Sequence, residues 1–247
     1  MSRNLCEATA LPIAGLVPLS TVDWPGQLVA TVFVQGCPWR CQYCHNTALL
    51  DCRLPGAVPW AQVEDLLARR QGLLDGVVFS GGEATRHPAL GAAMGRVREA
   101  GYRVGLHTGG AYPRRLAELA PLLDWVGFDV KGLPEDYPHI AGVEQAQGER
   151  SWQALAELAG AGIAVEARLT VYPGSHSPAA VAQCAARALA AGARTFALQQ
   201  ARDGEGQVLT PQNLPLRPQA AQSAVPFSEL AQKVMAIAGR KATIRAV

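Results

Sequence analysis

The stretch LVATVFVQG, residues 28–36, is a short apolar run rich in β-branched residues that ends in glycine. Runs of this kind are typical of strands buried on both faces of a parallel sheet. Similar runs recur at 76–82, 102–110, 124–132, 163–174 and 194–202. Helical periodicity occupies 59–74, 87–101, 113–123, 151–162, 177–193 and 227–239. This alternation predicts an α/β fold of about six β-α units, a parallel sheet with outer helices that forms an open or incomplete TIM-type barrel.

Length and composition predict one domain. The chain has 247 residues, of which 49% are hydrophobic and 17% charged, enough for a sizeable core. We expect a single domain over 1–247, with a core at about 15–202 and a helix and tail at 227–247. The segment 203–226 is rich in Gly, Pro and Gln, which predicts a surface loop.

Charge and hydropathy argue against two kinds of partner. A net charge of +2 gives no reason to expect binding to nucleic acid or to an anionic membrane. No secretory signal is visible, and no run approaches the ~20 apolar residues that span a bilayer. We therefore expect a soluble protein of the cytoplasm.

Three of the six cysteines stand within eight positions. The segment VQGCPWRCQYCHN (34–46) contains Cys37, Cys41 and Cys44 in the spacing C-x3-C-x2-C. It follows the first predicted strand, at the sheet edge where sites of parallel α/β folds gather. In a reducing compartment disulfides are rare, so clustered cysteines indicate metal binding or catalysis.

Three thiolates suit an iron–sulfur cluster with one open position. They can hold three irons of a [4Fe-4S] cluster and leave the fourth iron for a ligand, whereas a structural zinc normally takes four protein ligands. Cys52 and His45 are near enough in sequence to complete a zinc site, which remains an alternative. Cys6 lies near the N-terminus, and Cys184 falls in a predicted helix, where we expect it to pack.

With Tyr43 as its aromatic residue, the pattern C-x3-C-x-aromatic-C resembles the signature of the radical S-adenosylmethionine (SAM) enzymes. The wider segment 20–46 is similar to the glycyl-radical activating enzymes, and among these it resembles the activating proteins of anaerobic ribonucleoside-triphosphate reductase. The resemblance runs from about Gly15 to the sixth strand. It implies that Cys37, Cys41 and Cys44 hold a [4Fe-4S] cluster and that SAM binds its open iron.

The resemblance also implies a reaction. A flavodoxin or ferredoxin would donate one electron, SAM would be cleaved to methionine and a 5′-deoxyadenosyl radical, and that radical would take a hydrogen atom from a glycine of the reductase. Alternatives are an activase of another glycyl-radical enzyme, of the formate-lyase type, and a radical SAM enzyme acting on a small molecule, such as the deazaguanine-forming type. A non-enzymatic iron–sulfur or zinc module is a further alternative.

The segment SGGEAT (80–85) follows the second strand. Gly81 and Gly82 allow a sharp turn and a close approach to a ligand, and Glu83 adds a carboxylate. An ordinary βα turn would look the same. The motif resembles the family's GGE, which binds the amino group of SAM, although Ala84 stands where the family usually has proline.

Polar residues also end the later strands. FDVKG (128–132) carries Asp129 and Lys131 on one side of the strand, and EARLTVYPG (166–174) carries Arg168 in an apolar run. Buried charges need partners or ligands. Salt bridges between Asp129 and Lys131, and between Arg168 and Glu166, would suffice. The resemblance implies instead that Asp129, Lys131 and Arg168 bind the ribose and carboxylate of SAM.

Further candidates stand in HTGG (107–110), in TVDWPG (21–26) and near the ends of the later strands. In HTGG (107–110), Thr108 belongs to a small polar pair that the family places at the SAM site. His107 stands where formate-lyase activators carry an acidic residue of a cation site; a histidine bonded to backbone is equally expected. By resemblance, Asp23 of TVDWPG (21–26) would lie with His107 near the entry of the partner's glycine loop. Other positions considered are Gln199 and Gln200, which could face the cleft, and His176, which could line the opening but which we expect to be exposed because its neighbours are polar.

Overall fold

The computed structural model describes residues 8–210 and 225–246, which form two compact units. The first unit comprises Met1–Pro38 and Ala48–Gly127, and the second comprises Trp39–Thr47 and Phe128–Val247. The expectation of a single domain over 1–247 stays a prediction. Cys6 and residues 211–224 of the expected loop lie outside the described residues.

The first unit is built on four strands. They are β1 (Ile13–Ser20), β2 (Val29–Val34), β3 (Gly76–Gly81) and β4 (Arg103–Thr108). β2, β3 and β4 are parallel, and the apolar side chains of β2 and β3 are mostly buried, as expected for a covered parallel sheet. β1 is antiparallel to β2 and was not expected from the sequence, because Gly15 and Pro18 interrupt its apolar pattern. Edge strands tolerate such residues.

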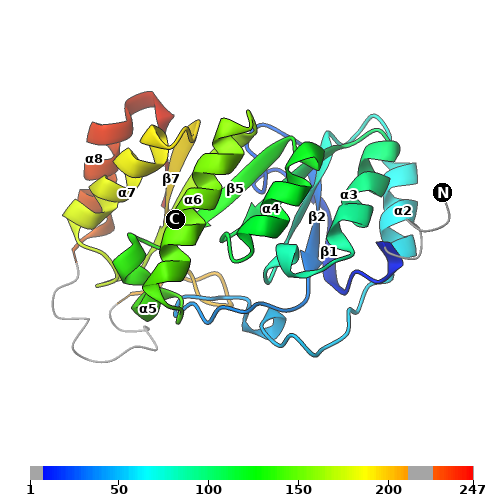
Figure 1. The fold of residues 1–247 in the computed structure, drawn as a ribbon, viewed down its shortest axis with the longest axis horizontal. Coiled ribbons are helices and arrows are strands. Elements are labelled where there is room, and N and C mark those ends of the chain that lie inside the picture. Colours follow the sequence, from blue (N-terminus) through cyan, green and yellow to red (C-terminus); the bar gives the residue numbers. More distant parts are fainter. Residues whose placement is uncertain (1–7, 211–224, 247) are drawn as a thin grey trace. The chain divides into compact units, whose positions relative to one another are not determined.

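Helices cover these strands (Figure 1). They are α2 (Trp60–Arg69), α3 (Leu90–Glu99) and α4 (Pro113–Leu119), with 3-10 turns at Thr47–Leu49, Ala84–Arg86 and Ala120–Leu122. The buried residues of α2, among them Val63, Leu66 and Leu67, recur at helical spacing. On the outer surface Arg96 of α3 pairs with Glu64 of α2 at 2.9 Å, which ties the two helices together.

The second unit contains the remaining strands. β5 (Trp125–Val130) runs across the boundary of the units, followed by β6 (Ala164–Val171), β7 (Thr195–Gln200) and β8 (Ala242–Arg245), and the last three are parallel. In β6, Val165, Ala167 and Leu169 are buried on one face, while Glu166 and Arg168 occupy the other. β8 was not expected, because four residues are too few to show a pattern.

The helices of the second unit are α5 (Tyr137–Ile140), α6 (Gln145–Gly160), α7 (Pro178–Ala190) and α8 (Phe227–Ala238), with 3-10 turns at Pro134–Asp136 and Gly239–Lys241. α7 and α8 lie side by side next to β7 (Figure 1). α6 begins six residues before its expected start. The first turns of α6 are polar, which hid them in the sequence. Within them Gly148 is buried and packs against the Tyr137 ring, from which a Cβ at this position would lie only 2.8 Å away. No described helix is long and apolar enough to cross a membrane.

All six expected strands are present, at nearly the expected positions. In the described part of the chain the outer strands β1 and β8 each hydrogen-bond to a single neighbour, so the sheet does not close. The prediction of an α/β fold that forms an incomplete barrel is therefore confirmed.

Candidate active site

The cysteine segment is shared between the two units. Cys37 belongs to the first unit, whereas Cys41 and Cys44 belong to the second. All three are partly buried, and none of the described cysteines forms a disulfide. Across residues 8–210 and 225–246, no group of three or more His, Cys, Asp and Glu side chains is arranged to hold a metal ion. The three cysteines are available as ligands, and their assignment as such stays a proposal.

In the first unit, Cys37 follows a tightly packed glycine. Gly36 has φ +95°, a conformation that favours glycine, and a Cβ there would lie 3.2 Å from the Cα of Cys52. The Cys52 thiol lies 3.5 Å from the carbonyl oxygen of Cys37 and 3.7 Å from that of Leu50. Cys52 therefore contacts the backbone that carries Cys37.

In the second unit, a turn presents Cys41 and Cys44. The Cys44 amide donates to the Cys41 carbonyl at 3.1 Å, and the amides of Arg40 and Gln42 donate to carbonyls at the end of α5. Burial raises the pKa of the Cys41 thiol, while the nearby Lys131 ammonium opposes this rise. A cation close to Cys41 favours its thiolate, which is the metal-binding form.

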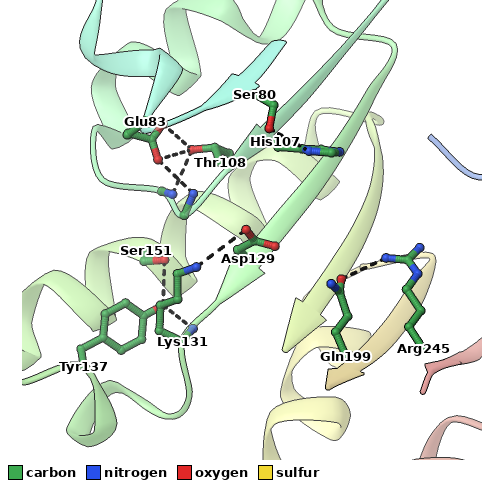
Figure 2. Close-up of polar contacts among 12 residues, drawn as sticks. Ser80, Glu83, His107, Thr108, Asp129, Lys131, Tyr137, Ser151, Gln199 and Arg245 are labelled. Carbon is green, nitrogen blue, oxygen red and sulfur yellow. Dashed lines mark hydrogen bonds and ion pairs between the residues drawn. The ribbon is translucent and has the colours of Figure 1, made fainter. Parts of the chain in front are cut away.

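Lys131 and Asp129 lie together, as the alternation along β5 predicted. Their charged groups are 3.7 Å apart (Figure 2), and the Lys131 ammonium lies 5.5 Å from the centre of the Tyr43 ring. Burial acts to lower the pKa of Lys131, but Tyr43, Asp129 and Cys41 outweigh it and raise the pKa well above its usual value. Lys131 is therefore a buried cation beside Tyr43, the residue that stands between Cys41 and Cys44 in the sequence.

The hydroxyl group of Tyr43 lies in a buried position where it lacks a hydrogen bond of normal geometry among the described residues. Burial raises the pKa of this phenol, and the neighbouring Lys131 ammonium opposes that rise. The ring packs against Tyr172, with centroids 5.9 Å apart. Because an unpaired buried hydroxyl costs about 1–3 kcal/mol, this atom marks a place where a polar ligand group would be stabilising.

Glu83 is the most fully enclosed carboxylate of the first unit, with 3% of its surface exposed. It accepts hydrogen bonds from the amide and hydroxyl of Thr85. It also accepts from the hydroxyl of Thr108 at 2.8 and 3.0 Å (Figure 2) and from the Gly109 amide at 3.0 Å. Burial raises the pKa of Glu83, and these hydrogen bonds act against that rise. The sequence indicated Glu83 and Thr108; it gave no signal for Thr85.

The two glycines before Glu83 allow backbones to approach closely. Gly81 has φ +115°, and a Cβ on Gly82 would lie 2.6 Å from the carbonyl carbon of Gly36. The Glu83 amide donates to the Gly36 carbonyl at 2.9 Å. The glycine turn therefore packs on the residue that precedes Cys37, and its role in binding SAM stays a prediction.

His107 and Asp23, predicted together at the entry of a partner loop, are in contact. The Nε2 atom of His107 lies 2.7 Å from the Asp23 carbonyl oxygen and its Nδ1 lies 3.1 Å from the Ser80 hydroxyl. The Asp23 carboxylate accepts from Thr31 at 2.6 Å. The expected bond from His107 to backbone is confirmed, on strand β4, while a role in partner binding stays a prediction.

Arg168 has the salt bridge that the sequence allowed. Its Nε donates to Glu166 at 2.7 Å, and the same carboxylate oxygen accepts from Arg245 of β8 at 2.8 Å. Arg245 also donates to Gln199 at 3.0 Å (Figure 2). Sequence reasoning missed Arg245, because its strand was not recognised. Gln200, the other glutamine considered, is the last residue of β7. In the described structure it forms no hydrogen bond to Arg245.

His176 was expected to be exposed, and this expectation was wrong. Only 8% of the residue is exposed, because its ring lies against Ser175 and the Lys131 carbonyl. Polar neighbours in the sequence suggested solvent, but here those neighbours are the hydrogen-bond partners of the ring. Cys184, expected to pack in a helix, is fully buried on α7.

Comparison with known proteins places the chain in a family. Residues 31–176 match the model of the radical SAM superfamily. A protein of Methanocaldococcus jannaschii named as a glycyl-radical enzyme activating enzyme is 34% identical over 123 residues, which is 48% of this chain and 50% of that protein. The pyruvate formate-lyase-activating enzyme of Clostridium pasteurianum is 30% identical over 136 residues, or 53% and 57% of the two chains.

A solved structure shows the same fold. A radical SAM methyltransferase from Sphaerobacter thermophilus superposes with a TM-score of 0.66 at 19% identity, covering 90% of this chain and 67% of that one. The chain belongs to the radical SAM superfamily, whose enzymes use a [4Fe-4S] cluster and SAM. It spans about half the length of the curated relatives that it matches.

The residues present fit these cofactors chemically. Three reduced cysteines stand in the spacing that serves a cluster. A buried anion, Glu83, and a buried cation, Lys131, match the opposite charges of the amino acid part of SAM. The buried hydroxyl of Tyr43, which has no hydrogen bond of normal geometry among the described residues, provides one more group that a polar ligand atom would stabilise.

Replacing Glu83 with glutamine should lower the free energy of unfolding by about 1–3 kcal/mol. The amide nitrogen cannot accept the hydrogen bonds that the carboxylate takes, so a buried donor is left unpaired. Chemical denaturation measures the change. Glu99→Gln is the matched control, because Glu99 is exposed on α3 and, among the described residues, forms a salt bridge to Arg96 alone; a surface pair of this kind contributes at most about 1 kcal/mol. Equal effects of the two changes would show that Glu83 is not held as described.

Proposed function

We propose that the protein is a glycyl-radical activating enzyme that uses its cluster and SAM to generate a glycyl radical on a partner enzyme. The observation that carries this proposal lies in the second unit, where the Lys131–Asp129 pair adjoins Tyr43, which stands between Cys41 and Cys44. Relatives named as activating enzymes support the class of reaction. When bound, the cofactors supply a one-electron cleavage of SAM that makes a radical able to abstract hydrogen.

The chain's own residues would bind and orient the cofactors. Cys37, Cys41 and Cys44 would ligate the cluster and leave one iron for SAM. Glu83 would take the ammonium of SAM, because its carboxylate is buried and fixed by hydrogen bonds before any ligand arrives. Asp129, Lys131 and Arg168 would bind the ribose and carboxylate of SAM, and Tyr43 would be a further cofactor-binding residue.

For the partner we propose anaerobic ribonucleoside-triphosphate reductase, on the strength of the sequence around the cysteines. A flavodoxin or ferredoxin would supply the electron, and the reducing cytoplasm would suit both the thiols and a low-potential cluster. The formate-lyase type of activase is the second candidate, because two of the matching relatives carry the name pyruvate formate-lyase-activating enzyme.

Anaerobic reconstitution tests the proposal. The protein is loaded with iron and sulfide, mixed with SAM and dithionite, and incubated with either the reductase or a formate lyase. Electron paramagnetic resonance should detect a glycine-centred radical on the reductase, and its backbone should become sensitive to cleavage by oxygen at that glycine. A radical on the lyase alone would assign the second candidate.

Two other outcomes would reject the activase. SAM cleavage that depends on a small heterocycle, with no protein radical, would assign a small-molecule enzyme. A colourless protein that binds zinc and leaves SAM intact would assign a structural metal module.

A further inference from the structure

The backbone of Lys131 and Gly132 is held by side chains from several elements. The Lys131 amide donates to the Tyr137 hydroxyl at 3.4 Å, and that hydroxyl donates to Ser151 at 3.0 Å (Figure 2). The Gly132 carbonyl accepts from the Trp152 indole at 3.0 Å. Since β5 ends at Val130, these bonds replace the strand ladder in fixing the residues that follow it.

His176 completes this arrangement. Its Nε2 lies 3.2 Å from the Lys131 carbonyl oxygen, and it arrives from the segment between β6 and α7. Gly132, with φ +134°, lets the chain approach the ring closely, because a Cβ there would lie 2.8 Å from Nε2 and 2.6 Å from the Cβ of Asp136. The His176 ring is therefore packed closely against the Lys131–Gly132 backbone.

The hydrogen bonds define which ring nitrogen carries the proton. The Lys131 carbonyl oxygen can only accept, so Nε2 of His176 must carry a hydrogen. In the neutral ring Nδ1 therefore accepts from the Ser175 hydroxyl, 2.8 Å away, whose oxygen accepts in turn from the Tyr172 amide at 3.0 Å. The tautomer follows from the two neighbours of the ring.

The surroundings of this ring disfavour its charged form. Burial lowers the pKa of His176 below its ordinary value of 6.5; Asp136 opposes that fall, and His139 of α5 adds to it. Protonation would turn Nδ1 into a donor and force the Ser175 hydroxyl to reverse. A neutral ring with one defined donor suits a fixed structural role.

We propose that His176 is a positioning residue for Lys131, which it holds by its backbone so that the ammonium stands at Asp129 and Tyr43. The inference rests on the proposed function, in which Lys131 binds SAM. Lysine has a long and flexible side chain, so its ammonium is placed accurately only if both ends are restrained. Asp129 restrains the charged end, and His176 restrains the backbone end.

SAM binding to the reconstituted, oxidised holoenzyme tests this role without turnover. Equilibrium dialysis with radiolabelled SAM should show that His176→Leu raises the Kd about tenfold, the size expected for one lost buried hydrogen bond. His176→Gln, which can place an N–H near the position of Nε2, should bind within about twofold of the parent protein. His139→Leu makes the same change on an exposed helix position and should leave the Kd unchanged.

A double-mutant cycle separates positioning from general damage. Lys131→Met should weaken SAM binding, and adding His176→Leu should then have little further effect, because His176 acts through Lys131. Additive losses would overturn the inference while leaving Lys131 as a SAM residue. Unchanged binding in Lys131→Met alone would instead reject the proposed place of Lys131 in the SAM site, and the inference with it.

Nitrogen NMR of histidine-labelled protein checks the geometry independently of SAM. At neutral pH, His176 should appear as the neutral tautomer with hydrogen on Nε2, assigned by its loss in His176→Gln. This measurement decides the matter if His176→Leu fails to fold. Hydrogen on Nδ1, or a charged ring, would overturn the inference.

Discussion

Replacing Cys41 with alanine should abolish the iron–sulfur cluster and all reductive cleavage of SAM, and Cys37→Ala and Cys44→Ala should do the same. Three thiolates are the minimum that leaves only one iron open, and a cluster held by two is poorly retained. Iron and sulfide analysis after anaerobic reconstitution, followed by chromatography of methionine released from SAM, measures both losses.

Cys184→Ala is the control for this series. Cys184 is fully buried on α7, so its loss should lower stability by about 1 kcal/mol through a small cavity while the cluster and SAM cleavage persist. Cys52→Ala should also retain the cluster, since the Cys52 thiol faces backbone carbonyls. Retention of a full cluster by any motif variant would contradict the assignment.

Gly82→Ala should destabilise the protein by about 3 kcal/mol, the upper end of the usual cost of overpacking. The added Cβ would stand 2.6 Å from the Gly36 carbonyl carbon and 3.0 Å from the Leu49 carbonyl oxygen. Both are backbone atoms that cannot rotate away. The turn would have to separate from Gly36, which breaks the bond from the Glu83 amide, so cluster content should fall together with the midpoint of chemical denaturation.

Gly95→Ala on α3 serves as the comparison. A Cβ at Gly95 meets nothing within 4 Å, and alanine is favoured over glycine in a helix by about 1 kcal/mol. This change should therefore leave the cluster intact and raise stability slightly. If Gly82→Ala proved as stable as Gly95→Ala, the close packing of the glycine turn on Gly36 would be wrong.

Sequence reasoning located the six parallel strands because each is a nearly continuous apolar run of its own. It missed β1 and β8 for different physical reasons. Pro18 and Gly15 are tolerated on an edge strand and hide the pattern of β1, while β8 is only four residues long. Because β8 was not predicted, Arg245 was not recognised either, although its guanidinium and that of Arg168 both bind the Glu166 carboxylate.

The sequence predicted the candidate site residues that belong to a local motif, but it did not predict the residues that hydrogen-bond to them. Glu83 and Lys131 stand in recognisable local patterns. Thr85 and His176 act through hydrogen bonds whose partners become apparent only when the chain is folded. His176 was misjudged for this reason, since a histidine among polar neighbours looks the same in sequence whether they hydrogen-bond to it or merely share its solvent.

The enclosure of Glu83 has a consequence for the thermodynamics of ligand capture. Thr85, Thr108 and Gly109 immobilise the carboxylate within the folded chain, so an arriving ammonium would meet a preorganised negative charge and little side-chain entropy would be lost on association. Loosening that frame, for instance with Thr108→Val, would make the entropy of binding less favourable even though the negative charge itself remains.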